Sequence, residues 1–360
     1  MRPEIVISGA GPVGCTLALL LHGGGRSVRI VALRGHREGA AAARPVALSY
    51  ASRIILERAG VWHALAVTPI ETIHVSQAAG FGRTRMSAAD AGVPALGYVI
   101  DYRALTHALA AQVQAGDIEI APGRHDTPAE RGEPPLVVHA EGMADDANEK
   151  RYEQTAVVAL VGCEPPALST AYERFTSEGP LALLPLEGRY GMVWATRDER
   201  ASALMAMPPR EFLDALQDRF GRRAGQFSSV DGRSSAPLAL RVRTARTGAR
   251  QAYVGNSAQT LHPVAGQGLN LGLRDAWELV RAIGDAPDAG EARVLDRYAA
   301  RRRPDAFAAI RITDLLAGLF VGANPVVKAA RGAAMCALDL CAPARRFLAR
   351  RMIYGASAIP

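Results

Sequence analysis

Lysine is scarce in this sequence of 360 residues: of 42 basic residues, only Lys150 and Lys328 are lysines. The formal net charge of +7 is therefore carried almost entirely by arginine. An arginine bias of this kind often reflects genome composition, and aromatic residues make up only 6% of the chain. Because no basic stretch is interleaved with aromatic side chains, as a binder of single-stranded nucleic acid requires, we expect no nucleic-acid partner.

Paired cysteines are also missing. The four cysteines, Cys15, Cys163, Cys336 and Cys341, do not have the spacing of metal or redox pairs, so no metal site is expected. Free thiols in a reducing cytosol are the default interpretation. An apolar strand is predicted from residue 4, which leaves no room for a secretory signal. We therefore expect a cytoplasmic protein.

No apolar run is long enough to span a bilayer. The longest one near the C-terminus, residues 315–327, is short and is interrupted by an Asn-Pro pair. Arginines at 301–303, 345–346 and 350–351 lie beside apolar helices predicted in this region, a pattern typical of contact with an anionic membrane surface. A solvated face on core helices gives the same pattern. Peripheral association with the cytoplasmic face of a membrane is thus one of two open interpretations.

The N-terminal segment has the pattern of a βαβ unit. A strand, a helix and a second strand are predicted within residues 4–33. Gly9, Gly11 and Gly14 form a G-x-G-x-x-G turn between the first strand and the helix. In this position the turn is the fingerprint of a dinucleotide site, in which the pyrophosphate lies on the helix N-terminus.

The acid that normally binds the ribose about 20 residues further on is missing. Ala32, Leu33 and Arg34 stand at the end of the second predicted strand, and the nearest acid is Glu38. Either the ribose is held in another way, or the adenosine part of a dinucleotide binds more weakly.

Two arginines are candidates for binding a pyrophosphate. Arg44 directly precedes a Pro-Val-Ala-Leu-Ser run, and Arg103 lies in the first turn of the helix predicted at residues 103–113. A guanidinium group can bind two phosphate oxygens at once. An ordinary solvated arginine is the alternative at both positions.

A second glycine-rich corner lies at residues 255–275. It follows a strand predicted at 251–254 and leads into a helix from Gly268 to about residue 283. Gly266 and Gly268 let the backbone approach a ligand, and the free N–H groups of the helix start favour an anion or a ring that becomes one. A turn that merely packs a helix on a sheet is the alternative.

The middle third is rich in β-type runs. Strands predicted at residues 152–162, 181–186 and 190–195 indicate a mostly antiparallel sheet, distinct from the βαβ start. Residues 122–151 are rich in glycine, proline and charge, and we interpret them as a loop and hairpin segment with one short strand at 136–139.

Together these segments resemble the FAD-dependent hydroxylases of ubiquinone biosynthesis, a branch of the class A aromatic flavoprotein monooxygenases. The resemblance covers nearly all of the chain. The blocks that carry it are residues 9–14, 44–49, 97–99, 152–158, 172–176, 179–185 and 255–275. The last two blocks are highly specific to that family.

The resemblance implies an α/β fold in which a Rossmann-type FAD/NAD(P)-binding domain is interleaved with a mostly antiparallel β-sheet substrate domain, followed by C-terminal helices. The FAD-binding domain would comprise residues 1–70, 98–142 and 250–305. The substrate domain would comprise 71–97 and 152–249. A C-terminal helical region would comprise 306–360. Separate helices are predicted at 293–303, at the end of the FAD-binding domain, and at 306–320 and 326–340 in the C-terminal region.

The cofactor implied is FAD, with its pyrophosphate on the first glycine turn and its flavin against the helix start at the second corner. That helix start would stabilise the negative charge of the reduced flavin. The residues expected to bind FAD are Gly9, Gly11, Gly14, Arg44, Arg103, Asn256, Gly266, Gln267, Gly268, Leu269 and Asn270.

The activity implied is hydroxylation of the aromatic ring of a polyprenylated phenol. In the family, reduced flavin and O₂ form a hydroperoxide that hydroxylates the ring, and NAD(P)H is the candidate reductant. Much of this chemistry belongs to the cofactor, while the protein supplies position and dryness. His262 and Pro263 would line the reaction cavity as catalytic residues. For His262, a histidine satisfied within the core is the alternative.

Two departures from the family pattern bear on activity, namely the missing ribose-binding acid after the second predicted strand and a missing segment, while the asparagine at position 256 is common in this branch of the family. The family carries a Gly-Ala-Asp-Gly-x-x-Ser-x-x-Arg segment, but here only nine residues, 143–151, separate Gly142 from Tyr152. Nine residues cannot hold a buried strand, its turn and a helix, so we expect the sheet to lose an interior strand. Asn256 also replaces the acid of the more general Gly-Asp motif.

These departures motivate an alternative hypothesis, a catalytically impaired family member that acts as a structural subunit of a quinone-biosynthesis complex. A nicotinamide dehydrogenase built on the same glycine turn ranks below both hypotheses. The sequence lacks a second βαβ nucleotide-binding half and an acid–base pair near it that could handle a hydride.

Overall fold

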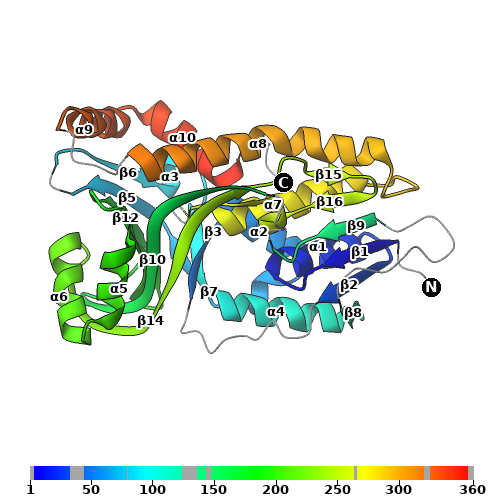
Figure 1. The fold of residues 1–360 in the computed structure, drawn as a ribbon, viewed down its shortest axis with the longest axis horizontal. Coiled ribbons are helices and arrows are strands. Elements are labelled where there is room, and N and C mark those ends of the chain that lie inside the picture. Colours follow the sequence, from blue (N-terminus) through cyan, green and yellow to red (C-terminus); the bar gives the residue numbers. More distant parts are fainter. Residues whose placement is uncertain are drawn as a thin grey trace.

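The computed structural model describes residues 4–32, 44–78, 80–123, 136–142, 147–262, 266–319 and 325–355. Figure 1 shows two sheet-based halves side by side, with the long helix α8 (Ala292–Leu319) running along the top. One half contains a largely parallel sheet, in which only β15 pairs antiparallel, and the other a largely antiparallel sheet. The predicted combination of a Rossmann-type half, an antiparallel half and C-terminal helices is confirmed.

The first sheet has six strands in the order β15-β16-β9-β1-β2-β8. Their bounds are β1 Ile5–Ser8, β2 Val28–Ala32, β8 Glu119–Pro122, β9 Leu136–His139, β15 Thr247–Gly248 and β16 Gln251–Tyr253. Helix α1 (Pro12–Gly23) connects β1 to the parallel strand β2, so the predicted βαβ start is confirmed. The main hydrophobic core lies between this sheet and helices α1, α4 (Tyr102–Ala115) and α7 (Gln267–Ile283).

The expectation that the sheet loses an interior strand is wrong. β9 lies between β1 and β16 and pairs in parallel with both. Leu136 and Val138 are fully buried there, which a strand of only four residues achieves because both neighbours satisfy its backbone. The next residues, Ala140-Glu-Gly142, are similar to the Ala-Asp-Gly of the family segment. β10 (Asn148–Glu164) begins shortly after Gly142, which leaves too few residues for the helix that the family segment would add.

The second sheet has eight strands in the order β17-β14-β10-β13-β12-β11-β5-β6. The bounds beyond β10 are β5 Thr72–Gln77, β6 Arg83–Ser87, β11 Thr170–Phe175, β12 Pro180–Leu186, β13 Arg189–Arg197, β14 Gln226–Val242 and β17 Gln259–Thr260. All neighbouring strands are antiparallel except β5 and β11, so the prediction of a mostly antiparallel sheet is confirmed.

The two faces of the second sheet have different neighbours. Helices α5 (Asp198–Ala206) and α6 (Pro209–Phe220) cover the outer face, where Leu181, Leu183 and Trp194 are buried. The rings of Trp194 and Phe212 meet edge to face with their centroids 6.3 Å apart. The inner face carries Leu184, which packs toward a third, smaller sheet.

This third sheet has the order β3-β7-β4, and it joins the two halves. Its strands are β3 Pro45–Ser49, β4 Thr68–Ile70 and β7 Gly97–Asp101, and helix α2 (Tyr50–Arg58) and the short helix η1 (Trp62–Ala64) follow β3. Pro45 lies so close to β13 that a Cβ on Gly191 would be 2.2 Å from its Cγ. The third sheet is therefore seated directly on the inner face of the second.

The prediction of separate helices at 293–303 and 306–320 is wrong, because α8 continues through Pro304. A proline inside a helix removes one backbone hydrogen bond and costs about 3 kcal/mol or more. The neighbours Arg302 and Asp305 are buried and ion-paired, which offsets that cost. The remaining helices are α3 Ala88–Ala91, α9 Pro325–Leu340 and α10 Ala342–Tyr354.

Four charged side chains are buried between α7 and α8. Arg302 Nε lies 2.6 Å from Asp275 Oδ1, and its Nη1 lies 2.7 Å from Asp305 Oδ2. Arg274 Nε lies 2.9 Å from the same oxygen of Asp305. Asp275 also accepts a hydrogen bond from the backbone N–H of Gly255, in the short helix η2 (Gly255–Ser257), at 3.0 Å. The network therefore ties α8, α7 and the end of β16 together.

Replacing Arg302 by methionine should lower the free energy of unfolding by about 3–5 kcal/mol, measured by urea denaturation. The substitution leaves two buried carboxylates without their shared cation. Arg301→Met is the matched control, since the Arg301 side chain is exposed and its only ion pair given by the described residues is loose, with Nη1 3.8 Å from Glu278 Oε2. Its effect should stay below about 1 kcal/mol. An equal decrease in the free energy of unfolding in the two variants would show that the buried ion pairs stabilise the fold no more than an exposed pair does.

Candidate active site

The first glycine turn is packed against the end of β9. Gly9 has a φ of +117°, and a Cβ there would lie 2.6 Å from the carbonyl carbon of Ala140. A Cβ on Gly14 would lie 2.0 Å from the carbonyl oxygen of Gly9. Gly11 is different, because a Cβ there would meet no atom of the described residues within 4 Å. The space beside Gly11 is therefore open for a ligand.

Helix α1 starts at this turn without a side-chain cap. Gly11 is the N-cap residue, Pro12 is the first helical residue, and the first turn contains no acid. No side-chain acceptor therefore occupies the N–H groups of the first turn. An anion beside Gly11 would satisfy them and interact favourably with the helix dipole.

The start of α7 has the same character. Gly266 is the N-cap residue in the left-handed conformation (φ +58°), with no side-chain cap and no acid in the first turn. Within the part of the chain that the structure describes, a Cβ on Gly268 would again meet no atom within 4 Å. A Cβ on Gly272 would lie 2.7 Å from Val13 of α1, so the two helices cross in contact near their N-termini. Two uncapped helix starts thus lie next to each other.

The side chain of Asn270 is fully used within the protein. Its Oδ1 accepts hydrogen bonds from the backbone N–H of Ser49 and the hydroxyl of Ser52, both at 2.7 Å. Its Nδ2 donates to the carbonyl oxygens of Ala47 at 2.9 Å and Gly266 at 2.8 Å. Asn270 therefore ties α7 to β3 and α2, and it can offer a cofactor only its backbone. This tie was not foreseen from the sequence.

Arg44 and Arg103 are brought to one edge by the pairing of β3 with β7. The guanidinium of Arg44 lies over the ring of Tyr102, 5.3 Å from its centroid, and the residue is exposed. Arg103 is half exposed, and its Nη2 lies 3.6 Å from Asp101. Neither side chain is buried in an ion pair, so both can turn toward a phosphate. Their role in binding FAD stays a prediction.

The end of β9 adds polar groups beside the first turn. Glu141 accepts hydrogen bonds from the backbone N–H of Ala140 at 3.1 Å and pairs with His139 Nδ1 at 3.2 Å. Burial acts to raise the pKa of the Glu141 carboxyl, but the hydrogen bond and charge of His139 outweigh it and hold the pKa below the usual value. Asn256 is exposed in η2, which follows the neighbouring strand β16. The Leu-Val-Val run before Ala-Glu-Gly is the signal that could have identified Glu141.

His262 is completely buried, and Pro263 lies outside the described residues. The Nε2 atom of His262 lies 3.3 Å from Gln154 Oε1, and its ring meets Tyr152 edge to face at 5.0 Å. Burial lowers the pKa of His262 to about 4, so its imidazole is neutral at neutral pH. This environment favours a role in positioning over one in exchanging protons with solvent.

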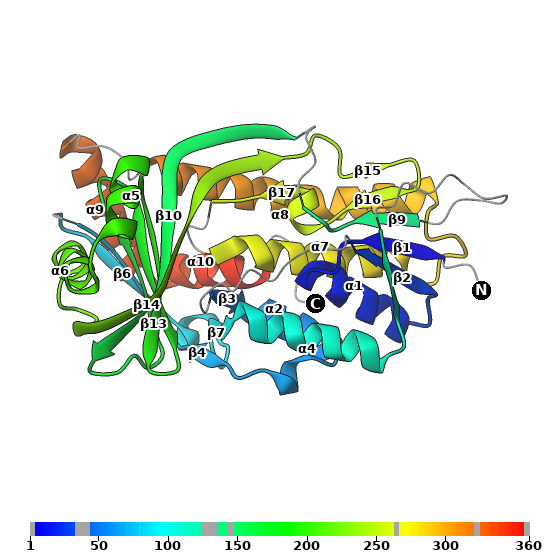
Figure 2. The same cartoon turned by 60° about the horizontal axis from the view of Figure 1, so that its bottom comes forward.

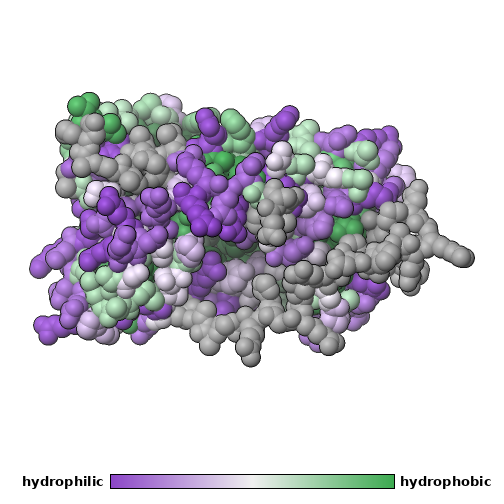
Figure 3. Space-filling model, in the orientation of Figure 1, coloured by the Kyte–Doolittle hydropathy of each residue, from purple (hydrophilic) through white to green (hydrophobic). Residues whose placement is uncertain are grey.

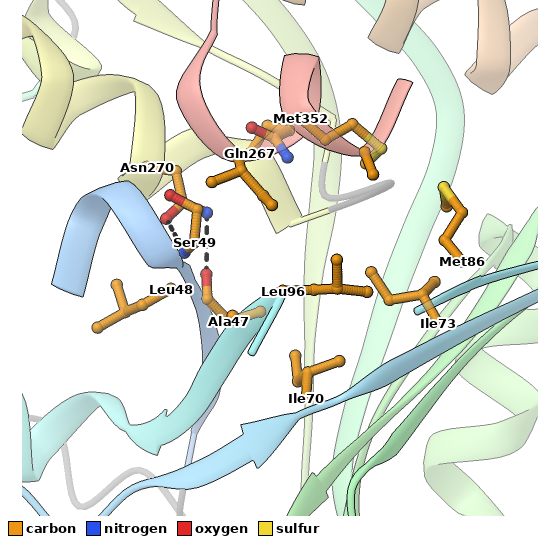
Figure 4. Close-up of a pocket in the computed structure, with 13 residues that line it drawn as sticks. Ala47, Leu48, Ser49, Ile70, Ile73, Met86, Leu96, Gln267, Asn270 and Met352 are labelled. Carbon is orange, nitrogen blue, oxygen red and sulfur yellow. Dashed lines mark hydrogen bonds between the residues drawn. The ribbon is translucent and has the colours of Figure 1, made fainter. Parts of the chain in front are cut away.

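An apolar pocket lies between the start of α7, the third sheet and α10 (Figure 4). Gln267 and Asn270 border it on the α7 side, and Met352 borders it from α10. The side chains that line the rest of the pocket are mainly aliphatic: Ala47, Leu48, Ile70, Ile73, Met86, Leu96, Ala349 and Ile353. Leu269 instead packs against the main core. The pocket suits a ring or chain of low polarity.

The residues present fit FAD. The open space beside Gly11 and the uncapped start of α1 suit a pyrophosphate, and the uncapped start of α7 suits a ring that gains negative charge. The apolar pocket beside α7 is where a ring system and an aromatic substrate would meet.

Comparison with known proteins defines the class. Residues 136–313 match the family described as "FAD binding domain", starting at the first residue of β9. The structure of p-nitrophenol 4-monooxygenase PnpA from Pseudomonas putida is similar with a TM-score of 0.76, 17% identity and coverage of 99% of both chains. The structure of Klebsiella pneumoniae HpxO complexed with FAD and uric acid is similar with a TM-score of 0.74 and 13% identity, covering 98% of this chain and 97% of that chain. The fold is that of the FAD-dependent monooxygenases.

Two sequence relatives narrow the class. Ubiquinone hydroxylase UbiL of Rhodospirillum rubrum is 32% identical, over 96% of this chain and 88% of the relative. The 3-demethoxyubiquinol 3-hydroxylase of Escherichia coli is 30% identical, over 84% of this chain and 86% of the relative. The chain belongs to the FAD-dependent hydroxylases of ubiquinone biosynthesis. Its alignment with the Rhodospirillum protein spans 385 positions, more than its own 360 residues, so that relative has residues which this chain lacks.

Replacing Gly11 by alanine should weaken FAD binding about tenfold while leaving the stability of the apoprotein nearly unchanged. The added methyl group meets no protein atom, but it enters the space that a pyrophosphate needs. Gly14→Ala should destabilise the apoprotein itself, because its Cβ would overlap the carbonyl of Gly9. FAD titration by fluorescence and thermal unfolding of both apoproteins separate the two effects. Unchanged FAD affinity in Gly11→Ala would place the pyrophosphate elsewhere.

Proposed function

We propose that this protein hydroxylates the aromatic ring of a polyprenylated phenol in ubiquinone biosynthesis, using FAD, O₂ and NAD(P)H as the reductant. The observation that carries the proposal is the pair of uncapped helix starts at Gly11 and Gly268, one of which borders an apolar pocket. The names of the two sequence relatives support the substrate class.

When bound, FAD supplies the chemistry that activates oxygen. The N–H groups at the start of α1 and the space beside Gly11 would hold its pyrophosphate, with Arg44 and Arg103 as further cations. The N–H groups at the start of α7 would stabilise negative charge on the flavin. The aliphatic side chains of the pocket would hold the ring of the substrate and exclude water. The buried imidazole of His262 would hold Gln154 in place on β10.

Nothing in the described part of the first sheet favours the alternative of an inactive structural subunit. β9 keeps the sheet continuous, and Glu141 would supply a carboxylate like that of the family's aspartate. Partnership with other quinone-biosynthesis proteins is compatible with activity and is kept as part of the proposal.

The proposal also includes peripheral contact with an anionic membrane through the α9 patch, defined as Phe81, Val326, Val327 and Lys328. Phe81 is 59% exposed, Val326 74% and Val327 40%. Gln77 holds the patch together by donating to the carbonyl oxygens of Phe81 and Lys328. Figure 3 shows apolar side chains at the upper left, where Figure 1 places α9. No helix of the described residues is long and apolar enough to cross a membrane.

The purified protein should show flavin absorbance and convert a short-chain prenylated phenol, with NAD(P)H and labelled dioxygen, to a product that carries one labelled oxygen atom by mass spectrometry. Complementation of a host that lacks the ubiquinone hydroxylase distinguishes the hypotheses. A side chain on Gly9 would overlap the backbone of Ala140, so the folding of Gly9→Trp is checked first by thermal unfolding; rescue by the wild type and not by a folded Gly9→Trp protein indicates an enzyme. Equal rescue by a folded Gly9→Trp protein that binds no FAD would identify a structural subunit.

Substituting Phe81, Val326 and Val327 by serine should weaken binding to anionic phospholipid vesicles at least tenfold, measured by co-sedimentation. The loss follows from the apolar area that the patch would bury in the lipid interface. Leu168→Ser is the control, because Leu168 is 77% exposed and lies outside the patch. Equal vesicle binding by the triple variant, or no binding by the wild type, would contradict the membrane contact and leave a protein partner for the patch.

A further inference from the structure

A row of five side chains crosses the inner face of the second sheet, and Glu173 is its one ionisable member. Residues directly opposite each other on neighbouring strands project to the same face. The pairings of β5, β11, β12, β13 and β10 place in one row Val75, Glu173, Ala182, Val193 and Val158. Leu181 and Leu183 lie on the outer face under α5 and α6, so the row lies on the inner face by alternation.

The inner face is left partly open at this row. Ala182, Val193 and Val158 are each half-buried, although the residues on both sides of them along the strand are buried. Ile73 precedes Val75 by two residues on β5, so it shares the inner face, and it lines the apolar pocket. The row therefore lies on the same face of the sheet as the pocket residue Ile73, two residues further along β5, although its five members are not among the residues that line the pocket.

Glu173 brings an unsatisfied carboxyl oxygen to this apolar row. Its Oε1 is buried and has no hydrogen-bond partner among the described residues. Burial raises the pKa of the Glu173 carboxyl to about 8, so at neutral pH the group is mostly protonated and can both donate and accept a hydrogen bond. A buried polar atom without a partner is costly and rare in folded proteins, unless a ligand or water supplies the partner.

We propose that Glu173 binds the ring hydroxyl of the aromatic substrate and thereby determines which phenols the pocket accepts. The assignment rests on the proposed function for the class of substrate. The aliphatic members of the row would contact the ring, and the carboxyl group would fix its orientation through one polar contact. A site built to hydrogen-bond a hydroxyl discriminates strongly against an analogue that cannot make the bond, because its own polar group then stays unpaired.

The test compares the binding of a short-chain prenylated phenol with that of its O-methyl ether to the FAD-loaded protein, by isothermal titration calorimetry. The wild type should bind the phenol about tenfold more tightly than the ether. Glu173→Leu should bind both equally, since it removes the hydrogen-bonding group. Glu173→Gln should keep most of the preference, because the amide can donate and accept. Glu211→Gln is the control, because Glu211 is an exposed residue of α6. It should leave the ratio of the phenol and ether affinities unchanged.

Thermal unfolding separates a binding defect from a folding defect. Glu173→Leu removes an unpaired buried polar atom, so its midpoint should not fall. A phenol preference that persists in Glu173→Leu, or a wild type without any preference, overturns the assignment. If the wild type hydroxylates the phenol while Glu173→Leu still binds the phenol more tightly than the ether, the proposed function stands and the role of Glu173 does not. A preference lost in Glu173→Leu without hydroxylation by the wild type supports the role and contradicts the proposed reaction.

Discussion

The buried carboxylate of Asp275 fixes the helix start on which the site depends. It accepts hydrogen bonds from the backbone of Gly255 and the side chain of Gln259, and it pairs with Arg302 of α8. Removing any one partner leaves a buried charge or polar group uncompensated, so these contacts form together or not at all. Gly272 adds a steric limit, because it allows α7 to touch α1 and leaves no room for a side chain. The two uncapped helix starts are therefore held at one separation.

The glycine corners of this fold can be predicted from the sequence, because local geometry decides them. Gly9 and Gly14 are required by contacts within a few residues of the turn or with the strand beside it. The place of β9 cannot be predicted in the same way, since it depends on pairing with β1 and β16, which are distant in the sequence. Its Gly/Pro-rich, charged surroundings have the pattern of a loop, and Glu141 replaces the aspartate of the family motif.

Side-chain roles at the site follow from tertiary contacts and were harder to predict. The polar character of Asn270 fits a ligand-binding residue, yet all of its hydrogen-bonding capacity goes to β3, α2 and its own helix. His262 lies on the predicted corner, but burial holds it neutral. Glu173 lies in one of the blocks that carry the family resemblance, but the sequence does not reveal its place on the inner face, because that place depends on the parallel pairing of β11 with β5. Pro304 has the pattern of a helix end, and only the buried pairs of Arg302 explain why α8 continues.

The strands β10 and β14 each have 17 residues, and Figure 2 shows them reaching from the second sheet toward the first. Their register shifts between Arg151 and Thr155, where Glu153 has a φ of +52°. Such a bulge bends a ribbon and interrupts its ladder of hydrogen bonds. The ribbon therefore bends close to the point where it approaches the first sheet. Gln154 lies at this bulge and contacts His262, so the second sheet is connected there to the second glycine corner.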